Sequence, residues 1–187
     1  RKGKWYMEYK ITDINSINMN VGVGNDQGNL FSDFLEGVDW WNASNSYAYE
    51  NNGNKRSTGV NASYGASYTT GDIIGIALDM DNRKLYFSKN GTFQDSGNPA
   101  SGASGTGAAF TLTENLFNKP LTYFFAWGDN DGSAGCTVEA NFGNPSFTIS
   151  SNSGNGNADA NGYGKFEYAV PSGYYALCTK NIGAYGG

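Results

Sequence analysis

The segment from residue 71 to residue 91, GDIIGIALDMDNRKLYFSKNG, constrains the fold more than any other part of the chain. Apolar side chains recur at every second position from 74 to 80, which is the period of a β-strand. An Asp-Asn pair then turns the chain, and Leu85 and Phe87 continue the apolar face on a returning strand. The Asn-Gly at the end is a dipeptide favoured in hairpin turns. The segment therefore predicts a β-hairpin with one face turned towards a core.

Alternation of apolar and polar residues recurs along the rest of the chain. The one helical candidate, residues 111–118, is too short and too rich in Thr and Asn to predict a helix. In residues 4–11 the odd positions from Trp5 to Ile11 point one way, which predicts a half-buried strand, and residues 17–24 are expected to pair with it. Polar, small-residue stretches at 94–109 and 150–164 predict surface loops. Further strands are expected at 47–50, 60–64, 121–127 and 136–142, with a closing strand at 173–182.

At least eight short strands joined by turns predict an all-β fold, an antiparallel β-sandwich of two sheets. A length of 187 residues indicates a single domain over 1–187. The chain begins at Arg1 without a methionine and enters a strand pattern at once, so we expect it to be a fragment of a longer protein.

Composition excludes some partners. The net charge of −5 offers no basic footprint for phosphates, so a nucleic-acid partner is not expected. No apolar run approaches the roughly 18 residues of a membrane helix, so membrane insertion is not expected either. Two cysteines, Cys136 and Cys178, are too few for a disulfide scaffold, and two buried free thiols are favoured over a single disulfide.

The sequence offers few candidate catalytic residues. The chain has no histidine, which excludes Ser-His and Cys-His nucleophile pairs and imidazole metal ligands. Glu8 and Glu139 stand singly on expected strands, so the paired carboxylates of glycoside hydrolysis are not indicated. The stretches DMDN (79–82) and GDNDG (128–132) look like pieces of a calcium loop, but neither has the full ligand run. We therefore expect no enzymatic activity, no metal and no cofactor.

Aromatic side chains on loops supply rigid contact area, and they also stack on sugar rings. Neighbouring residues of an extended segment point to opposite sides, so the adjacent tryptophans at 40 and 41 cannot both face a core. We expect the segments 39–52 and 127–131 to meet at one end of the sandwich and to form an aromatic patch with an acidic rim that includes Asp39. The candidate ligand-binding residues are Trp40, Trp41, Tyr47, Tyr49, Trp127, Asp129, Asn130 and Asp131.

Three blocks together resemble the SPRY domain family: GKWYMEYKI near the start, the 71–91 segment, and VEANFGNPSF towards the end. The most specific is the middle block, with its Gly-Asp before the strand, its Leu-Asp-x-Asp-Asn turn and its Phe-Ser-Lys-Asn-Gly exit. Arg83 departs from the family pattern, because many relatives carry glycine there. The turn is then expected to need Asn82 in the left-handed conformation.

The resemblance implies a bent sandwich related in shape to the concanavalin-like lectins, and a module that binds proteins through loops at one end without performing chemistry. The insertion QDSGNPASGASGTGAAF and the ending PSGYYALCTKNI look most like SPRY segments of bacteriophage structural proteins. We therefore expect a domain on a virion surface or fibre that serves host attachment or particle decoration. A generic protein-interaction module and a carbohydrate-binding domain stay open. The partners expected are accordingly a protein or a cell-surface glycan, with other virion proteins as further partners.

Overall fold

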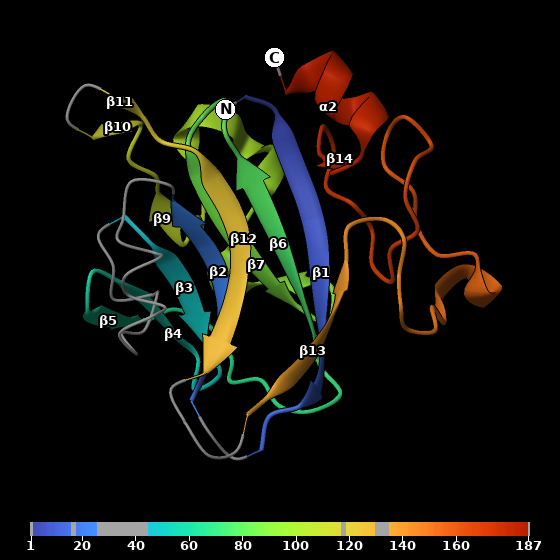
Figure 1. Cartoon of the computed structure of the whole chain (residues 1–187), viewed down its shortest axis with the longest axis horizontal. Helices are drawn as coiled ribbons and strands as arrows, with labels where there is room; N and C mark the ends of the chain where they lie inside the picture. The colour runs from blue at the N-terminus through green and yellow to red at the C-terminus, as the bar shows by residue number, and fades with distance from the viewer. Residues whose placement is uncertain (1, 16–17, 26–44, 117–118, 130–134, 187) are drawn as a thin grey trace.

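The computed structural model describes residues 2–15, 18–25, 45–116, 119–129 and 135–186, and two β-sheets dominate it (Figure 1). The first sheet has the strand order β13-β1-β6-β7-β8, with β14 beside β1 and β9 beside β7, and the second has the order β12-β2-β3-β4-β5. All strand pairs are antiparallel except that of β14 with β1. The predicted antiparallel β-sandwich is confirmed.

The strands of the seven-stranded sheet are β1 (Lys4–Asp13), β6 (Ile73–Asp79), β7 (Lys84–Lys89), β8 (Thr92–Phe93), β9 (Phe110–Thr111), β13 (Thr137–Asn141) and β14 (Tyr175–Ala176). Those of the five-stranded sheet are β2 (Met19–Asn25), β3 (Tyr47–Glu50), β4 (Asn54–Ser57), β5 (Val60–Ser63) and β12 (Tyr123–Asp129). A separate small pair is formed by β10 (Asn115–Leu116) and β11 (Lys119–Pro120).

The first two strands do not pair with each other, contrary to the expectation from sequence. β1 lies between β6 and β13 in one sheet, and β2 lies between β3 and β12 in the other. The neighbours of both strands therefore come later in the chain, and neither strand pairs with the other. The alternation that both strands show is explained instead by a shared core, since each turns one face towards the space between the sheets.

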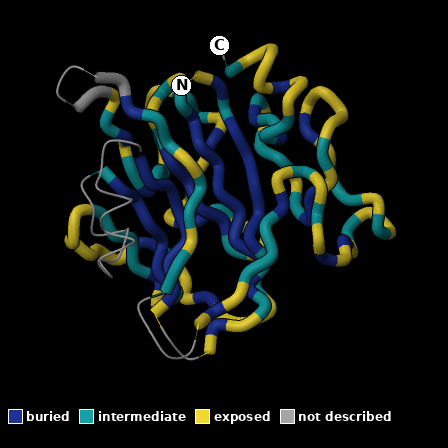
Figure 2. Tube along the Cα trace, viewed as in Figure 1, coloured by how far each residue is buried: buried dark blue, intermediate teal, exposed yellow. Residues whose placement is uncertain are grey.

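β1 is buried on both faces, so the expectation of a half-buried strand is wrong. Its odd-numbered side chains from Trp5 to Ile11 belong to the main core, as predicted. On the other face, Tyr6 and Glu8 are also fully buried, because chain segments that follow β13 cover this side of the sheet. Figure 2 shows the central strands buried along most of their length.

The β6–β7 hairpin forms as predicted, with Ile76 opposite Phe87 and Leu78 opposite Leu85. The carboxylate of Asp79 shapes the turn by accepting hydrogen bonds from the backbone N–H groups of residues 81 and 82, at 3.0 and 2.8 Å. The left-handed residue is Arg83, with φ of 56°, and not Asn82 as expected. The following Asn90-Gly91 turn has positive φ at both residues, as the type I′ hairpin turn requires.

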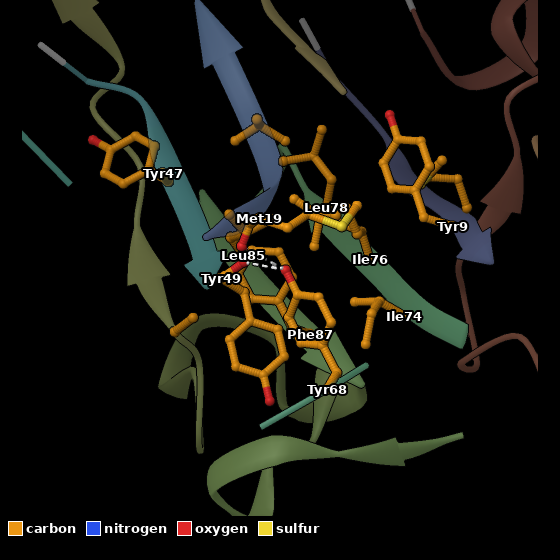
Figure 3. Packing of buried hydrophobic residues seen from close by; sticks show 14 of the residues in the cluster. Tyr9, Met19, Tyr47, Tyr49, Tyr68, Ile74, Ile76, Leu78, Leu85 and Phe87 are labelled. Atoms are coloured by element: carbon orange, nitrogen blue, oxygen red, sulfur yellow. Dashed lines mark hydrogen bonds between the residues drawn. The ribbon is translucent and has the colours of Figure 1, made fainter. Parts of the chain in front are cut away.

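Aromatic rings and aliphatic side chains together fill the main core between the sheets (Figure 3). Tyr49 of β3 lies 5.4 Å from Phe87 of β7 and 5.2 Å from Tyr68, measured between ring centroids. The hydroxyl group of Tyr68 donates to the backbone carbonyls of Met19 and Tyr49, so this buried polar atom is satisfied. Rings from both sheets thus interlock and fix how the two sheets face each other.

The predicted closing strand at 173–182 is mostly not a strand, and its last four residues begin a helix. Only Tyr175–Ala176 is extended, as β14, and the helix α2 (Thr179–Tyr185) follows with Cys178 as its N-cap. The consecutive polar residues 179–181 break the strand alternation. The buried side-chain amide of Asn181 donates to the Asp159 carboxylate and to the backbone carbonyl of Ala176, both of which lie outside the helix. Within the described ranges, no helix is long and apolar enough to cross a membrane.

The two polar stretches lie outside the sheets, as expected, but contain short 3-10 turns. These are η2 (Gln94–Ser96) and η3 (Pro99–Ser104) in the first stretch and η4 (Ser151–Gly154) in the second. Both cysteines are free, as predicted; Cys136 is buried and Cys178 is half-buried. The two ends of the chain lie near each other (Figure 1), since a Cβ atom placed on Gly3 would be 3.0 Å from the carbonyl oxygen of Tyr185.

Candidate binding groove

An apolar groove of about 350 Å³ lies on the side of the sandwich where the sheets end in the edge strands β12 and β13. β13 pairs with the second half of β1 and β14 with its first half, so β14 continues the edge where β13 stops. The groove is therefore bounded by β12, by the end of β13 and by the segment from β14 to α2. Its main lining side chains are Trp5, Phe124, Phe125, Phe142, Leu177 and Ile182.

Exposed aromatic rings give this groove its chemical character. Phe124 is 39% exposed and Phe142 is 37% exposed, which is unusual for phenylalanine in a folded protein. The ring of Phe142 lies 5.8 Å from that of Phe125, so rings from the two sheets meet across the groove. Among the described lining residues, Lys2 is the one that carries a charge. Such a surface favours apolar side chains as ligands.

A second hollow, of about 300 Å³, adjoins the groove and shares Phe142 and Leu177 with it. Two glycines let the backbone segments in its wall approach each other closely, because a Cβ atom on Gly143 would lie 2.9 Å from the Cα atom of Gly164. Gly143 also has φ of 110°, a conformation that other residues rarely adopt. The concave surface therefore continues beyond the groove, over residues that have small side chains or none.

Trp127 extends the apolar surface in the other direction. It lies on the same face of β12 as Phe125, two residues further along the strand, and its side chain is 39% exposed. Its register partner Val21 is fully buried, so the tryptophan points towards the inter-sheet space but lies at an edge where no further strand covers it. Its predicted partial exposure is thus observed.

Asp129, at the end of β12, is held by the chain that returns into β13. Its carboxylate accepts hydrogen bonds from the backbone N–H of Cys136 at 2.9 Å and from the thiol of the same residue at 3.1 Å. Burial and the neighbouring carboxylate together raise the pKa of the Cys136 thiol to about 12. At neutral pH this cysteine is therefore a protonated thiol and a poor nucleophile.

Two of the predicted ligand-binding residues are core residues. Tyr47 and Tyr49 are 7% and 0% exposed, because both point into the inter-sheet space from β3. Their hydroxyl groups have partners within the fold: that of Tyr47 shares a hydrogen bond with the Thr113 hydroxyl, and that of Tyr49 donates to the carbonyl of Ala66. The rings contribute to packing and offer no contact surface, which corrects the expectation from sequence.

Trp40, Trp41, Asn130 and Asp131 lie outside the described residues. The described parts of the two predicted segments do approach each other at one end of the five-stranded sheet. Asn51 exchanges hydrogen bonds with Met19, and Asp129 is the register partner of Met19 on its other side. Asn51 and Asp129 thus lie at the same end of the sheet with β2 between them, and the contact patch of the two segments stays a prediction.

The candidate carboxylate Glu8 is inaccessible. It is fully buried, and its two oxygens accept four hydrogen bonds, from the Tyr6 hydroxyl, the Asn141 amide and the backbone N–H groups of Glu167 and Tyr168. Burial raises the pKa of this carboxyl group, while the hydrogen bonds oppose the shift. Its partners make it an anchor for the C-terminal part of the chain.

In the Asp-rich turn at 79–82, the carboxylate oxygens of Asp79 are bound by other groups of the protein. Asp79 is fully buried, and in addition to the turn bonds it accepts a hydrogen bond from the Asn82 amide at 2.8 Å and forms an ion pair with Lys4 at 3.0 Å. Within the described part of the chain, no three Asp, Glu or Cys side chains gather in a way that could hold a metal ion.

The groove itself was missed by reasoning from sequence. The double phenylalanine at 124–125 was a usable signal, since one of two neighbouring residues in a strand must turn away from the core. The contribution of Leu177 and Ile182 had no such signal, because this part of the chain was expected to be a strand.

A comparison with protein families matches residues 4–145 to the SPRY domain. The chain belongs to the SPRY domain family. This match covers both sheets except β14 and ends just after β13. The segment from 146 onwards, which covers one sheet and forms a wall of the groove, lies outside it. SPRY domains are protein-interaction modules that are generally non-catalytic.

Among curated proteins, the dual specificity protein kinase splA of Dictyostelium discoideum is 32% identical over 99 residues. The aligned part is 49% of this chain but only 4% of the kinase. The similarity therefore covers a small part of that protein, and its kinase activity is a property of the whole relative.

Proposed function

We propose that this SPRY domain is a non-enzymatic binding module that uses the groove between β12, β13 and α2 to bind an apolar side chain of a partner protein. The observation that carries the proposal is the exposure of Phe124 and Phe142 in a hollow whose walls come from both sheets. Large exposed rings that converge on one hollow are typical of interaction sites.

The lining also favours one chemical class of partner. A sugar has many hydroxyl groups, and each one buried without a hydrogen-bond partner costs free energy. The main lining side chains offer aromatic and aliphatic atoms, with Lys2 as the charged group at hand. We therefore propose an extended peptide segment that inserts an aromatic or aliphatic side chain and carries a carboxylate beside it, where Lys2 complements its charge. Trp127 then contacts the continuation of the segment along β12.

A random peptide library displayed on particles tests this proposal, with the purified domain as bait. Selected peptides are expected to carry an aromatic or large aliphatic residue next to an acidic one. Their affinity, measured by fluorescence anisotropy, is expected to fall at least tenfold in Phe142→Ala, since truncating a central hot-spot ring typically costs about 2 kcal/mol or more. Val60→Ala is the control, because Val60 on β5 is 69% exposed and does not line the groove.

Other results contradict the proposal. Selected peptides that bind Phe142→Ala as tightly as the original domain would place the site elsewhere. Binding on a glycan array together with failure of the peptide selection would favour the carbohydrate-binding alternative. Turnover of a polysaccharide by the purified domain would contradict its non-enzymatic character.

As the setting of this binding we propose a virion surface or fibre, where the module serves host attachment or particle decoration. Support comes from the loop-rich insertion at 94–110 and from the C-terminal ending, which look most like those of bacteriophage structural proteins. Immunogold electron microscopy of particles from the source, with an antibody against this domain, tests the setting. Unlabelled particles would contradict it.

A further inference from the structure

The C-terminal wall of the groove comes from outside the part of the chain that matches the SPRY family. Leu177 follows β14 and Ile182 lies on α2, whereas the family match ends at residue 145. Residues 4–145 alone would leave the edges of β12 and β13 without this wall. What holds β14 and α2 in place therefore determines the shape of the groove.

One buried carboxylate connects the pieces of this wall. Asp159 is only 6% exposed, and one of its oxygens accepts hydrogen bonds from the backbone N–H groups of Asn161 and Tyr163, both at 2.9 Å. The other oxygen accepts from the backbone N–H of Ala176 in β14 at 2.9 Å and from the side-chain amide of Asn181 in α2 at 2.7 Å. A single side chain thus joins a loop, a strand and a helix.

The neighbouring contacts complete the network. The amide of Asn181, which is 1% exposed, also donates to the carbonyl of Ala176 at 2.9 Å, and its oxygen accepts from the Asn161 amide at 2.9 Å. The rings of Tyr175 and Tyr185 stack at 4.2 Å and join the start of β14 to the end of α2. All four donors to Asp159 are neutral groups, and without it the N–H of Ala176 would be buried without an acceptor.

We infer that Asp159 is a positioning residue for the groove: it fixes the wall that carries Leu177 and Ile182, and thereby sets the affinity for the partner without lining the groove itself. This inference rests on the proposed function of the groove. It assigns the specificity of this SPRY domain to its C-terminal segment. Partner choice then depends on residues that the family match does not include.

The test compares Asp159→Asn with the matched control Asp95→Asn, a substitution of an exposed aspartate in η2, away from the groove. In Asp159→Asn, an NH2 group takes the place of one carboxylate oxygen. It then faces the N–H groups that donate to this oxygen in the native protein. Hydrogen–deuterium exchange of the amides of Ile182 and Gly186, which bond to the carbonyls of Cys178 and Ile182, reports on the wall. The peptides selected for the groove report on affinity.

In Asp159→Asn, exchange in α2 is expected to accelerate at least tenfold and peptide affinity to fall at least tenfold, while exchange in the β6–β7 hairpin stays unchanged. Asp95→Asn is expected to change none of these. Should Asp159→Asn unfold the whole domain, Asn181→Ala provides a second variant that leaves the carboxylate in place and removes one of its four donors, together with the bonds of Asn181 to Ala176 and Asn161. Leu177→Ala is expected to weaken peptide binding without accelerating exchange in α2.

Unchanged exchange in α2 would overturn the inference, and so would a loosened wall that leaves peptide affinity intact. Failure of the proposed function is recognised separately, because no selected peptide would then depend on Phe142. The exchange measurement still decides in that case whether Asp159 holds the wall.

Discussion

Replacing Glu8 with Gln tests how the C-terminal segment is anchored on the outer face of the seven-stranded sheet. The carboxylate accepts from Tyr6 and Tyr168 on one oxygen and from Asn141 and Glu167 on the other. The amide group of Gln fits best at the first position, since the Tyr6 hydroxyl can rotate and accept from it. The backbone N–H of Tyr168 then faces another donor.

The magnitude follows from this geometry. One buried donor without an acceptor costs about 1–3 kcal/mol of unfolding free energy. The rotated Tyr6 hydroxyl can donate to the Ser88 hydroxyl, which is buried and otherwise has no partner, so no second donor is lost. A protonated Glu8 can use the same arrangement and still accept from Tyr168. The native protein with a neutral Glu8 is therefore more stable than the Gln variant.

The pH dependence has a definite sign. Because burial raises the pKa of Glu8 above its usual value near 4.5, the folded state binds the proton more tightly than the unfolded state. The stability that protonated Glu8 contributes is fully present below about pH 4.5 and declines as the pH rises through the raised pKa, with a limit of about 1.4 kcal/mol per pH unit. Glu8→Gln lacks this decline, so its deficit is expected to be largest in acid and to shrink towards neutral pH.

Urea denaturation followed by tryptophan fluorescence between about pH 4 and pH 8 measures both effects. Glu139→Gln serves as control, because Glu139 lies opposite Lys10 at the sheet edge and is only half-buried. Its change is expected to stay within about 0.5 kcal/mol at every pH. A deficit of Glu8→Gln that is absent, or that does not vary with pH, would refute this account of the anchor.

Two further predictions concern single residues. With 4,4′-dithiodipyridine at pH 7, Cys178 is expected to react at least tenfold faster than Cys136, because Cys136 is buried and its pKa is raised to about 12. Mass spectrometry of the labelled peptides measures the two rates, and equal rates would contradict the prediction. Arg83→Gly is expected to raise the free energy of unfolding by about 0.5–1 kcal/mol, because glycine adopts φ of 56° without the steric cost that other residues bear. The exposed ion pair that Arg83 forms with Glu114 contributes little, and a lower melting temperature in thermal unfolding would contradict the prediction.

Local patterns predicted the strands but not their partners. The β6–β7 hairpin was predictable because its turns and its apolar face lie within one short segment. The separation of β1 and β2 into different sheets depends on strands that follow more than a hundred residues later, such as β12 and β13. Alternation identifies the face that a strand buries, and it says nothing about which strand lies beside it.

The same limit applied to the candidate site. Trp127 was expected to be partly exposed because it stands where a strand meets a polar turn, and it is. Tyr47 and Tyr49 were assigned to a surface although their strand had been predicted, since aromatic content alone does not tell which ring a second sheet will cover. The wall around Leu177 depends on Asp159, a residue with no recognisable motif.

The closeness of the two chain ends makes this SPRY domain suitable for insertion into another protein. Gly3 and the carbonyl of Tyr185 are near neighbours, so a surface loop of a host protein can enter and leave the domain at almost the same point. The host would need to part its own chain only slightly, and short linkers would suffice. The groove beside α2 would then be displayed next to the junction, where it could serve as a recognition cassette on an unrelated scaffold.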